Sequence, residues 1–294
     1  MKVGFIGAGK VGRALGLYLN HHGLTVSGYY SKTGTSAQEA ARMTGSKHFT
    51  SMQDIANASS VLMLAVPDHA LEEVDHAIAT RMKAQNLGND KYLFHLSGAH
   101  ASDALAGIKA AGAEVGSMHP LQSFGEPISS AKRLSSTWFT LEGTEKAVEL
   151  AQAILSKTGN QYSLIKTEDK ALYHAGACVV SNFLVTLVES GIQFFEQAGM
   201  EPSRIVQAID PLIESTLSNI REKGTMEALT GPIVRGDYNT LSVHLDAIQA
   251  HLPEELDVYQ SMTRRTIQML EDKSWNREEA DRFQLRLGDM IYVN

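Results

Sequence analysis

The feature that most constrains the fold is a glycine motif that directly follows an apolar run at the start of the chain. The first thirteen residues read MKVGFIGAGKVGR, and the glycines are Gly7, Gly9 and Gly12. Residues 3–6 form a strand-like run, and a helical pattern begins at about residue 10. GxGxxG spacing alone is weak, but between a strand and a helix it is the fingerprint of a dinucleotide-binding unit.

Each glycine of this motif has a physical role. Gly7 permits the tight turn, Gly9 lets the backbone approach a pyrophosphate, and Gly12 lets the helix pack closely on the strand. The pyrophosphate then lies at the helix N-terminus. The predicted contacts of the motif with a dinucleotide come from Gly7, Ala8, Gly9, Lys10, Val11 and Gly12. The alternative is a glycine turn in a fold that has lost its cofactor.

The end of the next strand-like run indicates which dinucleotide binds. An NAD site usually carries Asp or Glu about 20 residues beyond the glycines, where it holds the ribose 2′-hydroxyl. Here residues 25–30 read TVSGYY and lead through Tyr30 into Ser31 and Lys32. A hydroxyl and an ammonium favour a 2′-phosphate, so we expect NADP(H). Alternatively, Ser31 and Lys32 are ordinary polar loop residues.

Charge and cysteine content narrow the class of protein. The 294 residues carry a formal net charge of −7, which argues against a nucleic-acid partner. The single cysteine, Cys178, excludes an internal disulfide and suits the cytoplasm. The first strand begins at residue 2, and no apolar run approaches the roughly 20 residues of a membrane span. We therefore expect a cytoplasmic protein with no signal peptide and no membrane partner.

The first half of the chain alternates between strand and helix patterns, which predicts a parallel, doubly wound Rossmann sheet. The expected strands are residues 2–6, 25–30, 61–65, 91–95, 114–118, 136–141 and 161–165. The expected helices between them are residues 10–22, 35–43, 69–84, 102–110 and 144–157.

The second half shows helical periodicity only. Its expected helices are residues 167–198, 202–222, 238–251, 254–271 and 276–290. The sequence thus predicts an α/β dinucleotide-binding domain over residues 1–163 and an all-helical domain for substrate binding and dimerisation over residues 164–294. A cleft between two such domains is a common ligand site.

Ligands of a doubly wound sheet bind at the carboxyl ends of its strands. The strand ending near residue 65 leads into Val66, Pro67 and Asp68, which we expect to line the cofactor groove, with Asp68 also capping the next helix. The following strands lead to Ser97 and His119. Ser97 either binds a substrate carboxylate or carbonyl or only shapes a turn, and His119 either reaches the substrate or only holds its loop.

The first helix of the second half carries a polar stripe. Lys170, His174, Cys178 and Ser181 recur at i, i+4, i+8 and i+11, with Asn182 at the margin. Reduction of a ketone needs a proton donor with a pKa near working pH, so Lys170 and His174 are our candidate general acids. The alternative is a solvent-facing stripe, which suits Lys170 and suits Asn182 poorly.

A glycine-bracketed loop, LTGPIVRGD at 229–237, carries Arg235 and Asp237. Arg235 either holds a substrate carboxylate, in its own cleft or across a dimer, or pairs with Asp237 while Asp237 caps the next helix.

Taken together, these segments resemble a family of two-domain Rossmann proteins with a C-terminal domain of unknown function, in the group of ketopantoate reductase, 6-phosphogluconate dehydrogenase and pyrroline-5-carboxylate reductase. The resemblance rests on GAGKVG at 7–12, AVPD at 65–68, HLSGAH at 95–100, GSMHPLQSF at 116–124, KALYHAGACVVSNF at 170–183 and LTGPIVRGD at 229–237.

The resemblance implies a hydride-transferring reductase whose helical domain forms a homodimer. Hydroxyacid dehydrogenases of the wider group place a Ser-Gly pair near the nicotinamide, which Ser97 and Gly98 match. They also place a Lys, and an Asn four residues later, on the linker helix. Lys170 matches the first, whereas His174 replaces the second and Asn182 offers an amide two turns on.

The leading hypothesis is therefore an NADPH-dependent reductase of a small 2-oxo acid, with 2-dehydropantoate as the best single substrate. Lys170 or His174 would donate the proton, while Ser97, Asn182 and His119 would hold the carboxylate. An imine reductase of the same fold is the first alternative, and an NADP(H)-binding redox sensor without turnover is the second. We expect no metal site.

Overall fold

The computed structural model describes residues 1–85, 88–271, 281–283 and 286–288. The chain divides into two compact units, Met1–Phe183 and Leu184–Asn294. This division lies within a helix, whereas the boundary predicted from the sequence marks the place where the strand patterns end. Each unit is described by itself.

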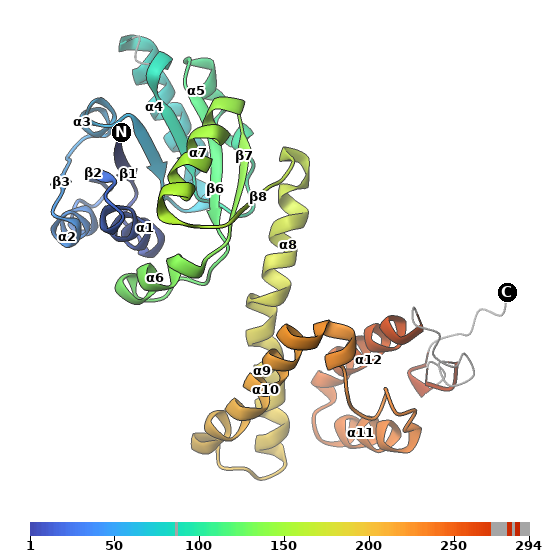
Figure 1. The fold of residues 1–294 in the computed structure, drawn as a ribbon. Helices are drawn as coiled ribbons and strands as arrows, with labels where there is room; N and C mark the ends of the chain where they lie inside the picture. The colour runs from blue at the N-terminus through green and yellow to red at the C-terminus, as the bar shows by residue number, and fades with distance from the viewer. Residues whose placement is uncertain (86–87, 272–280, 284–285, 289–294) are drawn as a thin grey trace. The chain divides into compact units, whose positions relative to one another are not determined.

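The first unit is built on one eight-stranded sheet with the order β3-β2-β1-β4-β5-β6-β7-β8 (Figure 1). The strands are β1 Lys2–Ile6, β2 Thr25–Tyr30, β3 Lys47–His48, β4 Val61–Leu64, β5 Tyr92–His95, β6 Glu114–Pro120, β7 Phe139–Gly143 and β8 Tyr162–Leu164. Strands β1 to β6 are parallel, which confirms the predicted Rossmann sheet. Strand β3 was not predicted from the sequence, because it has only two residues, both exposed.

The prediction of an entirely parallel sheet is wrong at β7, which pairs antiparallel with β6. Parallel neighbours need a connection that crosses to the other end of the sheet. The segment after β6 instead returns at the same end, where the backbone N–H of Leu121 donates to the carbonyl of Trp138 at 2.9 Å. Strand β8 then pairs parallel with β7.

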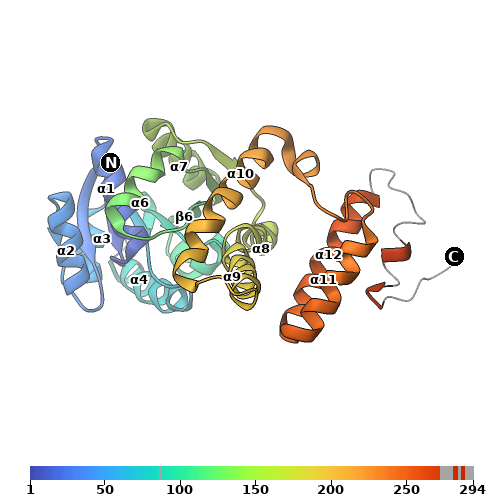
Figure 2. The same ribbon diagram turned by 90° about the horizontal axis from the view of Figure 1, so that it is seen from below.

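Helices cover both faces of the sheet (Figures 1 and 2). The α-helices of the unit are α1 Lys10–His21, α2 Thr35–Thr44, α3 Met52–Ala58, α4 Leu71–Gln85, α5 Ala106–Ala110, α6 Pro127–Arg133, α7 Glu145–Thr158 and α8 Lys170–Val180. Short 3-10 helices are η1 Asp68–Ala70, η2 Gly88–Asp90, η3 Ser102–Leu105, η4 Leu134–Ser136 and η5 Thr167–Asp169. Helices α3 and α6, which have seven residues each, were not predicted from the sequence.

Two buried apolar clusters mark the two faces. One contains Leu15 of α1 and Ile154 of α7, and the other contains Ile78 of α4 and Ile108 of α5. Asp68 opens η1 but does not cap it through its side chain, so the predicted capping role is wrong. Pro67 already occupies the capping position there.

The predicted helix over residues 167–198 is interrupted. Helix α8 ends at Val180, α9 spans Asn182–Gln197, and Ser181 between them has φ −123° and ψ −70°. Because Ser181 leaves helical geometry, the predicted polar face of Lys170, His174, Cys178 and Ser181 does not continue as one straight stripe.

The second unit is helical. It contains α10 Pro202–Ala228, α11 Tyr238–His251, η6 Pro253–Glu255 and α12 Leu256–Glu271, besides most of α9. Helices α11 and α12 lie side by side (Figure 2) and bury Leu241, Leu245 and Ile267. The predicted helix over residues 276–290 lies largely outside the described residues.

The expectation of no membrane partner rested on the lack of a long apolar run, but one segment has the length and composition of a membrane-spanning helix. This segment is Thr167–Gln197, and its most apolar stretch is not buried within the described part of the chain. The expectation counted uninterrupted apolar runs, whereas here scattered polar residues such as His174 lie among many apolar ones.

Candidate functional site

A groove of about 780 Å³ lies at the carboxyl ends of β1, β2 and β4. Its lining includes most of the predicted cofactor residues: Gly7, Ala8, Gly9, Lys10, Val11, Tyr30, Ser31, Lys32, Val66 and Pro67. Gly12 and Asp68 are not part of the lining. The lining also includes residues that the sequence analysis did not name, among them Thr33, Ser36, His69, Glu73 and Phe124. Phe124 follows β6, so the groove extends toward that strand.

The glycines fit a dinucleotide in the way the motif predicts. Gly7 has φ +95°, and a Cβ there would lie 2.3 Å from the carbonyl oxygen of Ala65. A Cβ on Gly12 would lie 2.8 Å from the Cβ of Ala65, so the first turn of helix α1 packs closely on the residue that follows β4. A Cβ on Gly9 would meet nothing within 4 Å, which leaves its backbone open to the groove. Together with the N–H groups in the first turn of α1, whose N-cap Gly9 has no side-chain cap, this arrangement suits a pyrophosphate.

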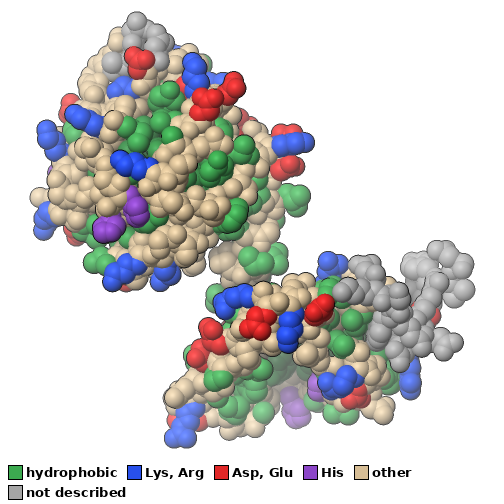
Figure 3. All heavy atoms as spheres, in the orientation of Figure 1, with side chains coloured by type: hydrophobic (Ala, Val, Ile, Leu, Met, Phe, Trp, Pro, Cys, Tyr) green, Lys and Arg blue, Asp and Glu red, His purple; other side chains and the backbone are tan. Residues whose placement is uncertain are grey.

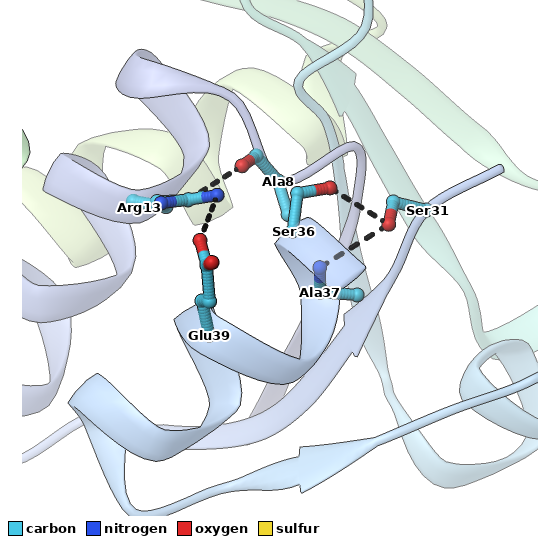
Figure 4. Close-up of polar contacts among 6 residues, drawn as sticks. All are labelled: Ala8, Arg13, Ser31, Ser36, Ala37 and Glu39. Carbon is cyan, nitrogen blue, oxygen red and sulfur yellow. Dashed lines mark hydrogen bonds and ion pairs between the residues drawn. The ribbon is translucent and has the colours of Figure 1, made fainter. Parts of the chain in front are cut away.

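At the end of β2, the side chain of Ser31 is hydrogen-bonded to residues of α2 (Figure 4). Its hydroxyl oxygen accepts hydrogen bonds from the hydroxyl of Ser36 at 2.9 Å and from the backbone N–H of Ala37 at 3.2 Å. Ser31 therefore ties its loop to the first turn of α2. The same contacts bring the N-terminal turn of α2 to the groove, where its N–H groups favour an anion.

Two carboxylates lie near this part of the groove, although neither belongs to the end of β2. Glu39 is held by Arg13 at 2.8 Å, and Arg13 also donates to the carbonyl of Ala8 at 2.8 Å (Figure 4). Glu73 lines the groove and lies 3.8 Å from the Lys32 ammonium. The Lys32 side chain is 89% exposed, so its charge is available to a ligand.

Lys170 is buried beside β6, with 1% of its surface exposed. Its ammonium donates to the hydroxyl of Ser117 at 2.6 Å, and Ser117 donates to the carbonyl of Ser97 at 3.4 Å. Burial lowers the pKa of Lys170 to about 8, although the charges of Glu142 and Asp68 oppose this. The solvent-facing alternative for Lys170 is therefore wrong, because α8 begins against the sheet.

His119 and Tyr173 form a second contact between β6 and α8. The Nδ1 atom of His119 and the hydroxyl of Tyr173 share a hydrogen bond of 2.8 Å. Burial, followed by the charge of Lys170, lowers the pKa of His119 to about 4, and burial raises the pKa of Tyr173. At neutral pH the imidazole is therefore uncharged and the phenol is protonated.

Gly98 lies between two histidine rings. A Cβ at this position would be 2.5 Å from Nδ1 of His174 and 2.8 Å from Nε2 of His119. Nδ1 of His174 is buried and has no hydrogen-bond partner within the described part of the chain, while Nε2 lies 3.5 Å from the Cys178 sulfur. A buried ring nitrogen without a partner is a natural contact for a polar ligand.

Ser97 takes the turn role that the sequence analysis left open. Its hydroxyl oxygen accepts from the backbone N–H groups of Ala99 at 3.2 Å and His100 at 3.0 Å. A hydroxyl that accepts twice still has its own proton to donate, so a contact with a substrate oxygen stays compatible with the turn.

Two other predicted residues have exposed side chains. Asn182 is exposed at the start of α9, and no contact given above for Lys170, His119 or His174 involves it. Arg235 belongs to the second unit and is exposed. Asp237 accepts from the backbone N–H of Thr240 at 3.1 Å, which confirms the predicted cap of α11.

Three residues around Lys170 and His119 were not predicted from the sequence: Ser117, Glu142 and Tyr173. Ser117 lies two positions before His119, and strand residues two apart face the same side, so that spacing could have revealed it. Tyr173 directly precedes His174 on the helix that carries the predicted polar stripe, so its position also could have revealed it. No local sequence pattern indicates Glu142, because its partners are far away in the sequence and come close only when the sheet forms.

Family models match both halves of the chain. Residues 1–120 match a Rossmann-like domain, and residues 137–266 match a domain of unknown function, DUF2520. The chain thus combines a Rossmann-like domain with a DUF2520 domain, as the resemblance implied. No curated protein matches the sequence.

Solved structures share the fold over nearly the whole chain. A provisionally named NADP oxidoreductase from Bacteroides fragilis is 20% identical with a TM-score of 0.72, covering 90% of this chain and 96% of that one. A Thermotoga maritima protein is 24% identical with a TM-score of 0.71, covering 93% and 100%. An imine reductase from a Pseudomonas species is 16% identical with a TM-score of 0.60, covering 91% and 94%. The chain therefore has the fold of NAD(P)-dependent reductases.

Proposed function

We propose that this chain, with its Rossmann-like and DUF2520 domains, is an NADPH-dependent reductase of a small 2-oxo acid, and that 2-dehydropantoate is the substrate. The observation that carries the proposal is the buried ammonium of Lys170, whose pKa is lowered to about 8. At neutral pH such a group is mostly protonated, yet it releases its proton more readily than an exposed lysine.

The chemistry of carbonyl reduction needs this kind of group. Bound NADPH would supply the hydride, and the carbonyl oxygen gains negative charge that a nearby donor must stabilise and then protonate. Lys170 meets both needs. His119 does not, because with a pKa of about 4 it holds no spare proton at neutral pH.

The same ammonium favours a keto acid over an imine. A protonated imine carries a positive charge, which a buried ammonium beside it would disfavour, whereas a 2-oxo acid brings a carboxylate that the ammonium attracts. In this proposal the free Nδ1 of His174, the Nε2 of His119 and the hydroxyl of Ser97 position the carboxylate.

NADP(H) is preferred over NAD(H) because of the groups at the end of β2. Lys32 is exposed in the groove, and the first turn of α2 lies beside Ser31 and Ser36. Glu73 opposes an added phosphate, but Lys32 lies within 3.8 Å of that carboxylate and offsets its charge.

The first experiment mixes the purified protein with NADPH and 2-dehydropantoate and follows the loss of nicotinamide absorbance, with NADH in parallel. Faster oxidation of NADPH than of NADH supports the proposal. Oxidation with cyclic imines but not with keto acids would replace it with the imine alternative. Binding of NADPH without oxidation by any keto acid or imine would favour the redox sensor.

Two variants test the assignment within the site. Lys170→Ala and His174→Ala should each lower turnover. The variant that lacks the proton donor should lose roughly 10²- to 10⁴-fold, which is the usual contribution of general-acid catalysis. NADPH affinity should change little, because neither residue lines the groove. Unchanged turnover in both variants would remove these residues from the mechanism.

We also propose that the protein is a homodimer through α8 and α9. Large apolar side chains are exposed along these helices, namely Leu172, Val179, Val180, Phe183, Val185 and Leu187. Figure 3 shows hydrophobic side chains between charged ones on the visible face. A second copy would bury such side chains. Light scattering coupled to size-exclusion chromatography should give a mass of twice the 32.0 kDa of one chain. The mass of one chain at micromolar concentration would refute the proposed dimer.

A further inference from the structure

We propose that Glu142 is a positioning residue that holds the start of α8 against the sheet and keeps the Lys170 ammonium available as an acid. This inference rests on the proposed function. Glu142 is a buried carboxylate that does not line the cofactor groove and is not among the groups proposed to contact the substrate.

Glu142 is a clamp between three segments. It lies in β7, where it is the register partner of Ser117 in β6, and only 4% of its surface is exposed. One carboxylate oxygen accepts from the backbone N–H of Ser102 at 2.7 Å. The other accepts from the hydroxyls of Ser102 at 2.7 Å and Thr167 at 3.1 Å.

These partners connect the two parts of the candidate active site. Ser102 opens η3, directly after the loop that carries Ser97 and Gly98, and Thr167 opens η5, one turn before Lys170. A buried carboxylate that accepts three hydrogen bonds satisfies the rule that buried charges are hydrogen-bonded, and its charge also acts on the Lys170 ammonium. Glu142 therefore fixes the distance between the turn and the helix.

Its charge acts on Lys170 as well. Lys170 donates to Ser117, the strand neighbour of Glu142, and the Glu142 charge favours the protonated form of the ammonium. The other titratable groups around Lys170 are Asp68 from η1, His95 from β5, His119 from β6, and Tyr173 and His174 from α8. Besides Glu142, the negative charge that raises the pKa of Lys170 is that of Asp68, which is exposed.

Glu142→Gln separates the charge from the shape. The amide can keep a hydrogen bond to each partner, since the hydroxyls of Ser102 and Thr167 can turn to accept. We expect the pKa of Lys170 to fall by roughly one unit. The alkaline limb of the kcat/KM profile should then move to lower pH, and activity at pH 7.5 should fall about threefold. Thr167→Val instead keeps the charge and should lower kcat without moving that limb.

The matched control is Glu114→Gln, at the start of the neighbouring strand β6. Glu114 pairs with Lys146 at 3.3 Å and lies three residues from Ser117, which is about 10 Å along a strand. Removal of that charge should leave the alkaline limb in place. An equal displacement in both variants would show an effect of net charge and overturn the role of Glu142.

A second readout does not depend on turnover. Trace acetylation over a range of pH, followed by mass spectrometry of the peptide that contains Lys170, reports the pKa of that amine against exposed Lys146 in the same protein. A fall in Glu142→Gln supports the inference even if no keto acid is reduced. An active enzyme whose Lys170 has the same pKa in both forms would refute it and leave the proposed function standing.

Discussion

Replacement of Lys170 by methionine should stabilise the protein at neutral pH while it abolishes the proposed chemistry. The pKa of Lys170 falls from 10.5 to about 8 on burial, so the folded state disfavours the charged form. At about 1.36 kcal/mol per pKa unit this costs roughly 3 kcal/mol below pH 8. Methionine has a similar shape, and loss of the hydrogen bond to Ser117 costs about 1 kcal/mol. The expected net gain at pH 7 is therefore about 2 kcal/mol.

The pH dependence gives this prediction its sign. Between pH 8 and 10.5 the unfolded chain binds more protons at this lysine than the folded chain, so wild-type stability rises with pH across that window. The advantage of Lys170→Met should therefore shrink to about zero near pH 10. Urea unfolding of the ligand-free protein at pH 7 and pH 10 measures both differences.

The control for this experiment is Lys166→Met, an exposed lysine four residues earlier in the same segment. It should change stability by less than about 0.5 kcal/mol at either pH. A Lys170→Met protein that is less stable than the wild type at pH 7, or equally altered at both values, would refute the reasoning from burial.

Three further substitutions test the contacts around this lysine and the cofactor groove. Tyr173→Phe removes the hydrogen bond to His119 and should lower kcat/KM about three- to tenfold in the NADPH assay, with unchanged NADPH affinity. Gly98→Ala places a Cβ 2.5 Å from Nδ1 of His174 and should lower both the melting temperature and kcat/KM; wild-type values for both would contradict the packing. Lys32→Met should weaken NADPH binding about three- to tenfold in a fluorescence titration and leave NADH unchanged, and an equal loss for both cofactors would argue against a 2′-phosphate contact.

The sequence predicted the parallel strands well because each is a short apolar run between helical patterns. The strands at residues 2–6 and 25–30 have the predicted bounds. It failed at β7, because strand direction depends on where the connection packs and not on the strand's own residues. It also failed at Ser181, where a local break interrupts an otherwise helical pattern.

In the candidate site, too, features that depend on local sequence were predicted, and features that depend on long-range packing were not. The glycine motif is local, and the structure gives Gly7 and Gly12 the close contacts that the motif predicts. The burial of Lys170 is not local, because it depends on β6 and β7 lying beside the first turn of α8. Glu142 could not be found from the sequence for the same reason, since its partners lie 25 and 40 residues away.

The two reversed strands also determine how the site is layered. Strand β8 ends at Leu164, which pairs with Leu141 of β7, and Leu141 pairs with Met118 of β6. The chain therefore leaves β8 at the level of Met118. Helix α8 then follows the direction of β6, since Lys170 is hydrogen-bonded to Ser117 and Tyr173, three residues later, is hydrogen-bonded to His119. Position along α8 therefore measures depth in the site. A single residue inserted between β8 and α8, if it shifted the helical phase at Lys170, would turn the helix by about 100° and withdraw both contacts together.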